Sequence, residues 1–477
     1  MTIEQGLYLR NWRIEIMKIR FFVVTVILLT LALYAAFIHD HETISREQAC
    51  CAALIVSLGA LPSIVSLISR REASLIPLMP LHGLFYALIF GLPVFSSALD
   101  WSRVHSTVIT DTLYLTILGI FCLLVGYYAS RGLYASSRRP IRFLNDVTLK
   151  RRICIAWIIY TMHILLQLVP SLVTLPSVGQ LSTPLGYLST GMMLILALEN
   201  VVSKKHLILL TVAIGFSLVT KLLSGSLAQA VFLLVFLGIL YWGKKRTLPL
   251  GFIFICCVIA ILLNPMKSKY RDLTFVAVDS VQLSYASKAK MFFQATYDHY
   301  VNDDFDPSEG IDKGVVNRIG HSVTAFADVI DMTPLPVPYW LGGSYQTLWT
   351  SFIPRFLWPN KPQATIGNEF GHRYNLLGPT DKSTSHNLPW LPEFYANFGM
   401  IGVLAGMFAV GLLFRLLVQK LSVPISSSIE YVLGVAVTFN LFYAESNFAL
   451  MAGGVVTSYL ALLLLLRILT FKRKLIL

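Results

Sequence analysis

WLPEFYANFGMIGVLAGMFAVGLLF, residues 390–414, passes from a polar loop directly into an apolar segment that is long enough to cross a membrane. The whole chain has 477 residues, of which 56% are hydrophobic and only 13% are charged. Such a composition is typical of a membrane protein with many spans, and it argues against a soluble protein. Because a helix needs ~20 apolar residues to cross the bilayer core, the repeated apolar stretches predict an all-α polytopic membrane protein.

Twelve apolar stretches predict membrane spans. They lie at residues 21–38, 49–68, 75–98, 108–129, 153–170, 184–200, 206–222, 227–242, 248–263, 398–418, 429–447 and 449–466. One long polar segment separates the ninth span from the tenth. The sequence therefore predicts three parts, which are a nine-helix transmembrane region at 1–263, a large loop at 264–397 and a three-helix transmembrane region at 398–477.

The distribution of basic residues predicts the orientation of these spans. If both termini are cytoplasmic, the cytoplasmic segments hold 24 Lys and Arg residues and the short outside loops hold 3. Lys and Arg accumulate on the cytoplasmic side of membrane proteins. We therefore expect a multi-pass protein of a bacterial inner membrane, with both termini in the cytoplasm and the large loop in the periplasm. The net charge of +13 follows from this bias, and we expect membrane lipid, not nucleic acid, around the basic residues.

Four cations in the large loop are candidates for binding a diphosphate. They are Arg318, Arg355, Lys361 and Arg373, and they lie near a segment rich in Trp and Tyr. The guanidinium fork of Arg pairs with two phosphate oxygens at once, which makes it suited to this ligand. The alternative is that these residues are solvated or paired on the loop surface.

Several groups in or near the loop could move a proton. His321 lies three residues after Arg318 and shares its helix face, and Glu393 directly precedes the tenth span, at a depth where ionisable groups are costly and often functional. Glu369 and, in the eleventh span, Glu445 could line the same site. The alternatives are a hydrogen-bonded structural histidine and a carboxylate that stabilises a helix N-terminus.

We expect neither a metal nor a cofactor at this site. Asp303, Asp304, Asp306 and Glu309 could together hold a divalent cation, but their spacing does not fit a calcium-binding loop. A solvated acidic turn is the simpler interpretation.

Three motifs resemble the Wzy-type family of O-antigen and exopolysaccharide repeat-unit polymerases. They are GGSYQTLWTSFIPRFLWPNKP at 342–362, IGNEF at 366–370 and EFYANFGMIGVLAG at 393–406. The family also tends to carry a Gly-Ser-Arg turn between two earlier helices. The corresponding turn here, Ser224–Leu227, has no Arg.

The resemblance implies a metal-independent glycosyltransferase with a membrane-embedded C-type fold. Both donor and acceptor would be oligosaccharides linked to a polyprenyl (undecaprenyl) diphosphate, and the product would be a lipopolysaccharide O-antigen or an exopolysaccharide. Arg355 and Arg318, with Lys361 or Arg373, would grip the donor diphosphate, and His321 or Glu393 would deprotonate the acceptor. Tyr395, in the third motif, would line the site, and a chain-length-regulating copolymerase is an expected partner.

Two other functions fit the same architecture. An O-antigen ligase would use the same donor but transfer the glycan to a different acceptor. A flippase for lipid-linked glycans would carry functional groups in mid-membrane and an inverted repeat, and the long one-sided loop favours an enzyme over such a transporter.

Overall fold

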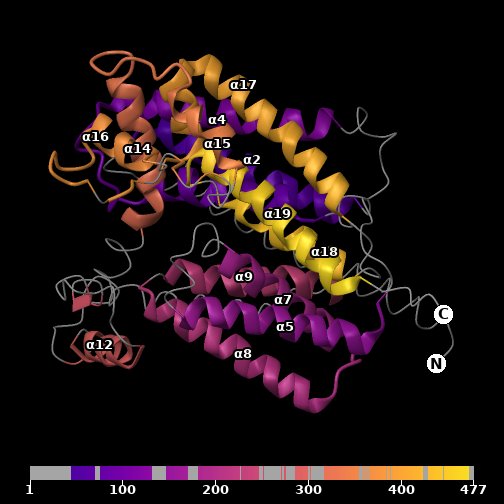
Figure 1. The fold of residues 1–477 in the computed structure, drawn as a ribbon. Coiled ribbons are helices and arrows are strands. Elements are labelled where there is room, and N and C mark those ends of the chain that lie inside the picture. The colour runs from indigo at the N-terminus through magenta and orange to yellow at the C-terminus, as the bar shows by residue number, and fades with distance from the viewer. Residues whose placement is uncertain are drawn as a thin grey trace. The chain divides into compact units, whose positions relative to one another are not determined.

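The fold is taken from a computed structural model of the chain (Figure 1). The structure describes residues 44–69, 76–130, 147–169, 181–225, 227–245, 251, 270, 273–274, 285–298, 301, 316–353, 358, 360–361, 365–382, 384–386, 388–422, 428–443 and 445–471. The first predicted span, most of the ninth, the Asp303–Glu309 turn and Arg355 lie outside these residues. In the described part of the chain every regular element is a helix. The chain forms two compact units, Met1–Ser189 with Ile319–Leu477, and Thr190–Arg318.

Seven of the described helices are long and apolar enough to cross a membrane. They are α2 (Arg46–Ile68), α3 (Leu78–Tyr86) with its continuation to Phe95, α4 (Ser106–Ala129), α8 (Lys204–Leu223), α9 (Leu227–Lys245), α17 (Trp390–Leu421) and α19 (Phe448–Thr470). They correspond to seven of the twelve predicted spans. The prediction of an all-α membrane protein is thereby confirmed.

Three further predicted spans are helical without meeting this criterion. The fifth forms α5 (Leu149–Leu168), whose first turn is basic, and the sixth forms α7 (Ser182–Leu198). The eleventh, predicted to reach residue 447, forms α18 (Ser428–Thr438) and one 3-10 turn, η10 (Phe439–Phe442). Its helix thus ends several residues early, and the described residues Tyr443 and Glu445–Asn447 are irregular.

Glycines allow the helices of the larger unit to approach closely. A Cβ atom on Gly126 of α4 would clash with the carbonyl oxygen of Phe408 on α17, and one on Gly411 of α17 would clash with that of Leu123 on α4. Small residues at such contacts are characteristic of membrane helix pairs, where close packing replaces the hydrophobic driving force. The helices α4 and α17 therefore form a tightly packed pair (Figure 1).

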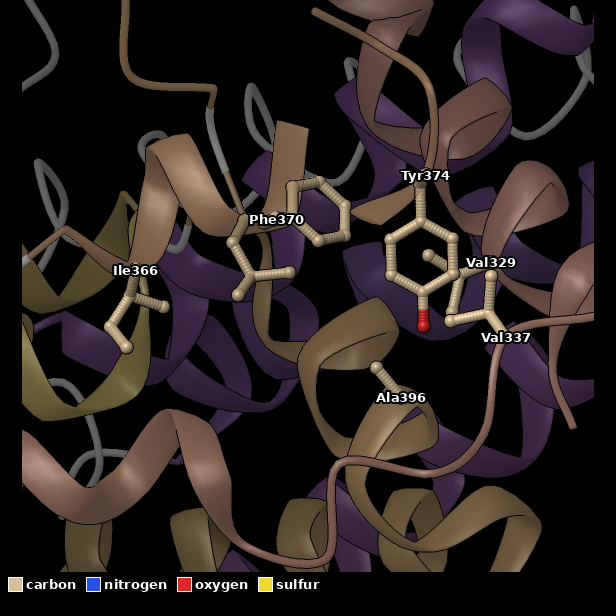
Figure 2. Packing of buried hydrophobic residues seen from close by; sticks show 7 residues of the cluster. Val329, Val337, Ile366, Phe370, Tyr374 and Ala396 are labelled. Atoms are coloured by element: carbon tan, nitrogen blue, oxygen red, sulfur yellow. The ribbon is translucent and has the colours of Figure 1, made fainter. Parts of the chain in front are cut away.

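Short helices from the predicted loop pack onto the beginnings of α17 and α19. They are α14 (Asn317–Met332), η9 (Gly343–Tyr345), α15 (Gln346–Ser351) and α16 (Ile366–Arg373). On α14, Val323 and Phe326 lie three residues apart, share one helix face and are both buried. Figure 2 shows the ring of Tyr374, just after α16, beside Val329 and Val337, with Ala396 of α17 below. This core fixes the loop helices against the membrane helix.

The second unit is described by itself. It contains the end of α7, the antiparallel neighbours α8 and α9, and α12 (Tyr285–Tyr297). The turn between α8 and α9 uses Gly225 at a φ of 76°. An ion pair of 2.6 Å joins Lys244 Nζ on α9 to Glu199 Oε1 just after α7.

Candidate functional site

The site begins at a break in α17. The helix starts after Pro389 and tolerates Pro392 because a proline in the first turn has no intrahelical partner to lose. It is then interrupted at Phe398 and Gly399, and Gly399 adopts φ 62° and ψ −149°. The break frees the carbonyls of the two preceding residues, which accept the backbone N–H groups of Trp340 (2.8 Å) and Leu341 (3.2 Å). The segment before η9 is thereby fixed along the start of α17.

Asn397, the residue two positions before Gly399, is fully buried and satisfies its whole amide. Its Nδ2 donates to Ser344 Oγ at 2.9 Å and to the carbonyl oxygen of Glu393 at 2.8 Å. Its Oδ1 accepts the N–H of Gly342 at 2.9 Å. Asn397 therefore holds η9 in register with α17.

Glu393 lies one helical turn before Asn397 and is also fully buried. Its Oε1 accepts Ser344 Oγ–H at 2.7 Å, and its Oε2 accepts the N–H of Phe448, the first residue of α19, at 2.7 Å. Glu393 thus lies in the first turn of its own helix α17 and also accepts the first N–H of α19. One buried side chain joins α17, η9 and α19.

Burial also affects a phenol beside this network. Burial raises the pKa of Tyr345, and the carboxylate of Glu393 raises it further. The phenol therefore stays protonated across the physiological range, and it lies among the rings of Phe394, Phe398 and Phe448.

Glu445, in the irregular segment before α19, is a second buried carboxylate. Its Oε2 accepts Tyr443 Oη–H at 2.5 Å, and its Oε1 accepts Ser322 Oγ–H from α14 at 3.3 Å. The next residue, Ser446, accepts the indole N–H of Trp390 through its carbonyl at 2.9 Å. The indole of Trp390 thus satisfies one backbone carbonyl of this irregular segment that has no partner within a helix.

His321, the predicted base on α14, pairs with His386, another histidine of the predicted loop. Its Nε2 lies 3.3 Å from Nδ1 of His386, and the two ring centroids are 4.5 Å apart. Both imidazoles are half-buried, and the N–H of His386 is anchored on the carbonyl of Gly367 at 3.1 Å. Two ring nitrogens at this distance can share one proton.

The predicted cations occupy different environments. Arg318 is exposed one turn before His321 on α14. Arg373 donates through Nη2 to the carbonyl of Pro338, and its guanidinium carbon lies 5.1 Å from the ring centroid of Trp340. Lys361 is held by the carbonyl of Ile353 at 3.1 Å. The structure therefore brings Arg373 beside the segment fixed on α17.

Two residues predicted to line the site, Tyr395 and Glu369, have different neighbours. Tyr395 is half-buried, with ring-centroid distances of 6.1 Å to Phe326 and 6.5 Å to Tyr339. Glu369 accepts Thr365 Oγ1–H at 2.5 Å, which ties it to the start of its own helix α16. This hydrogen bond does not connect Glu369 to Glu393 or Glu445.

Sequence reasoning assigned no role to Ser344 or Asn397. The signal for Asn397 was available, because a polar residue four positions after Glu393 shares its helix face and directly precedes Phe398 and Gly399. Ser344 gave no comparable signal, since a serine between a Gly pair and a Tyr is ordinary turn chemistry.

These features define a class of protein, a helical membrane protein in which two buried carboxylates fix polar helices onto the ends of two spans. A family model described as a domain of unknown function, DUF8712, matches residues 94–477, and the chain belongs to this family. No curated protein and no solved structure matches the chain.

Proposed function

We propose that the chain is a membrane-embedded glycosyltransferase that joins oligosaccharide repeat units linked to a polyprenyl diphosphate. One observation supports this most strongly. The first and third motifs that resemble the Wzy-type polymerases meet in space, because Ser344 of the first and Glu393 and Asn397 of the third form one buried network. Ser344 and Glu393 are 49 residues apart in the sequence, yet they share a buried hydrogen bond. Two segments that served only as connecting loops would not require such a contact.

The proposed topology keeps twelve spans, two cytoplasmic termini and a periplasmic segment 264–397 in a bacterial inner membrane. The basic residues of the short loops support it, as do the seven helices with suitable length and apolarity. In this orientation the networks around Glu393 and Glu445 face the periplasmic end of α17 and α19.

We assign different roles to the two predicted bases. Glu393 is fully buried and both of its oxygens already accept hydrogen bonds, so it positions η9 and α19. His321 is half-buried, its imidazole is a common proton acceptor in catalysis, and Arg318 lies one turn away. We therefore propose His321 as the group that accepts the proton.

The proposed reaction balances without metal or nucleotide. An acceptor hydroxyl oxygen attacks the anomeric carbon of the donor, and its proton passes to His321. The bond between the anomeric carbon and the diphosphate oxygen breaks, the configuration inverts, and the polyprenyl diphosphate leaves with the bonding electrons. Arg318 and Arg355, with Lys361 or Arg373, stabilise the charge on the leaving group.

A reconstituted assay tests this proposal. Purified protein should convert lipid-linked repeat units into a ladder of longer chains without ATP, and a chelator should leave the ladder unchanged. His321→Ala should abolish the ladder, whereas the control His105→Ala, on an exposed histidine at the start of α4 whose side chain makes no capping hydrogen bond, should preserve it. A single transfer to another acceptor would indicate a ligase, and transbilayer movement without a new bond would indicate a flippase.

A further inference from the structure

Large apolar side chains are strongly exposed around η9 and α15, outside the predicted spans. Leu341, just before η9, is 76% exposed, and Trp349 on α15 is 78% exposed. A soluble surface rarely leaves such side chains in water together, and contiguous exposed apolar area marks an interaction surface.

The backbone of Leu341 is held in a conformation that is energetically unfavourable for leucine. Leu341 adopts a φ of 49°, in the left-handed region that a branched side chain disfavours. Its N–H is bonded to the carbonyl of Asn397, and the next N–H, of Gly342, is bonded to the Asn397 side chain. The same buried residue that fixes η9 thus fixes the direction of an exposed leucine.

The exposed residues adjoin the outer surfaces of two spans. On α17, Phe398 is 48% exposed and Ile401 is 73% exposed, and a Cβ atom on Gly342 would lie 3.6 Å from the Phe398 ring. On the other side, Ser351 at the end of α15 packs so closely on Gly453 of α19 that a side chain there would clash. Leu341 therefore lies beside exposed apolar residues of α17, and the helix that carries Trp349 packs on α19.

The chemistry of the segment identifies what covers it. Residues 341–353, LGGSYQTLWTSFI, contain no Asp, Glu, Lys or Arg. A surface that binds a soluble protein is normally rimmed by charged groups, whereas a segment at the membrane interface combines apolar side chains with Trp, Tyr and small polar residues.

We infer that η9 and α15 lie within the bilayer and that an apolar face formed by Leu341, Trp349, Phe398 and Ile401 contacts the acyl chains of one leaflet. The predicted loop 264–397 is then not wholly aqueous. Because Ser344, bonded to Glu393, lies within the same short segment, the buried network sits directly behind a lipid-facing surface. This inference needs only α17 and α19 to span the membrane, and it is independent of the proposed chemistry.

Spin labels in proteoliposomes test the inference. The six native cysteines are first replaced by serine or alanine, and labels are then placed through Leu341→Cys and Trp349→Cys. Collision rates with oxygen, which concentrates in lipid, and with a water-soluble nickel chelate give the depth of each label. Leu460→Cys, on the exposed face of α19, provides the lipid control, and Thr380→Cys, in the exposed turn after α16, provides the water control.

The two outcomes are distinct. Preference for oxygen at positions 341 and 349, closer to that at 460 than to that at 380, supports immersion. Preference for the nickel chelate at both positions, equal to that at 380, overturns it. If the strained backbone at Leu341 does not tolerate substitution, the label at Trp349 alone decides. Neither result alters the ladder assay, so failure here is separable from failure of the proposed function.

Discussion

Replacing Gly399 by alanine should destabilise the whole arrangement around Glu393. Gly399 adopts φ 62° and ψ −149°, a region open to glycine and closed to residues with a side chain. A Cβ atom there would also lie 2.9 Å from Tyr339 Oη, so that phenol would have to move. Relaxation toward a regular helix would in turn withdraw the carbonyls that hold Trp340 and Leu341.

The magnitude follows from these terms. Forcing alanine into this backbone region costs about 1–3 kcal/mol, and losing one of the two freed backbone hydrogen bonds adds about 1 kcal/mol. We expect a loss of about 2–4 kcal/mol, which corresponds to a fall in Tm on the order of several degrees. Gly454→Ala is the matched control, because Gly454 lies within α19 with nothing within 4 Å of its Cβ position. There alanine should stabilise by about 1 kcal/mol.

The assay is thermal unfolding of the detergent-purified variants, followed by the loss of the monodisperse peak in size-exclusion chromatography. Gly399→Ala should unfold below the wild-type protein and Gly454→Ala at or above it. Equal Tm values for the two variants would refute the reasoning, because they would mean that the break at residue 399 imposes no backbone requirement.

Three further predictions use the same preparation. Asn397→Ala removes three side-chain hydrogen bonds around buried groups, so it should lower the free energy of unfolding by about 2–3 kcal/mol. An unchanged Tm would show that this network does not stabilise the packing of η9 on α17. Burial raises the pKa of Asp328 on α14 from 3.8 to about 6 against the opposing charge of Arg103, so the folded chain binds this proton more tightly than the unfolded chain does. The resulting stability is full below pH ~4 and is lost as pH rises through ~6, and Asp328→Asn should reduce the fall in Tm between pH 5 and 7.5. Arg355→Lys should abolish most ladder formation while insertion is kept, since Lys cannot form the bidentate fork; a normal ladder would remove Arg355 from the site.

Local patterns predicted the helices well, because span length and periodicity depend on residues close in sequence. The segment 108–129 predicted α4, Ser106–Ala129, almost to the residue. The eleventh span shows where this reasoning stops. The predicted span continues to residue 447, but the helical turns end at Phe442, and beyond them the indole of Trp390 bonds the carbonyl of Ser446. Hydropathy alone does not predict hydrogen bonds with residues that are distant in the sequence.

The role of Glu393 likewise could not be predicted from the residues near it in the sequence. A carboxylate before a span predicts an unusual environment, but the choice between a base and a structural group depends on what its oxygens bond. Those partners are Ser344, 49 residues earlier, and the N–H of Phe448, 55 residues later. Neither position is chemically distinctive in the sequence, since one is a serine in a turn and the other is a backbone amide. A buried carboxylate with both oxygens occupied is costly to move and well suited to holding geometry. The half-buried His321–His386 pair therefore becomes the stronger candidate for moving the proton.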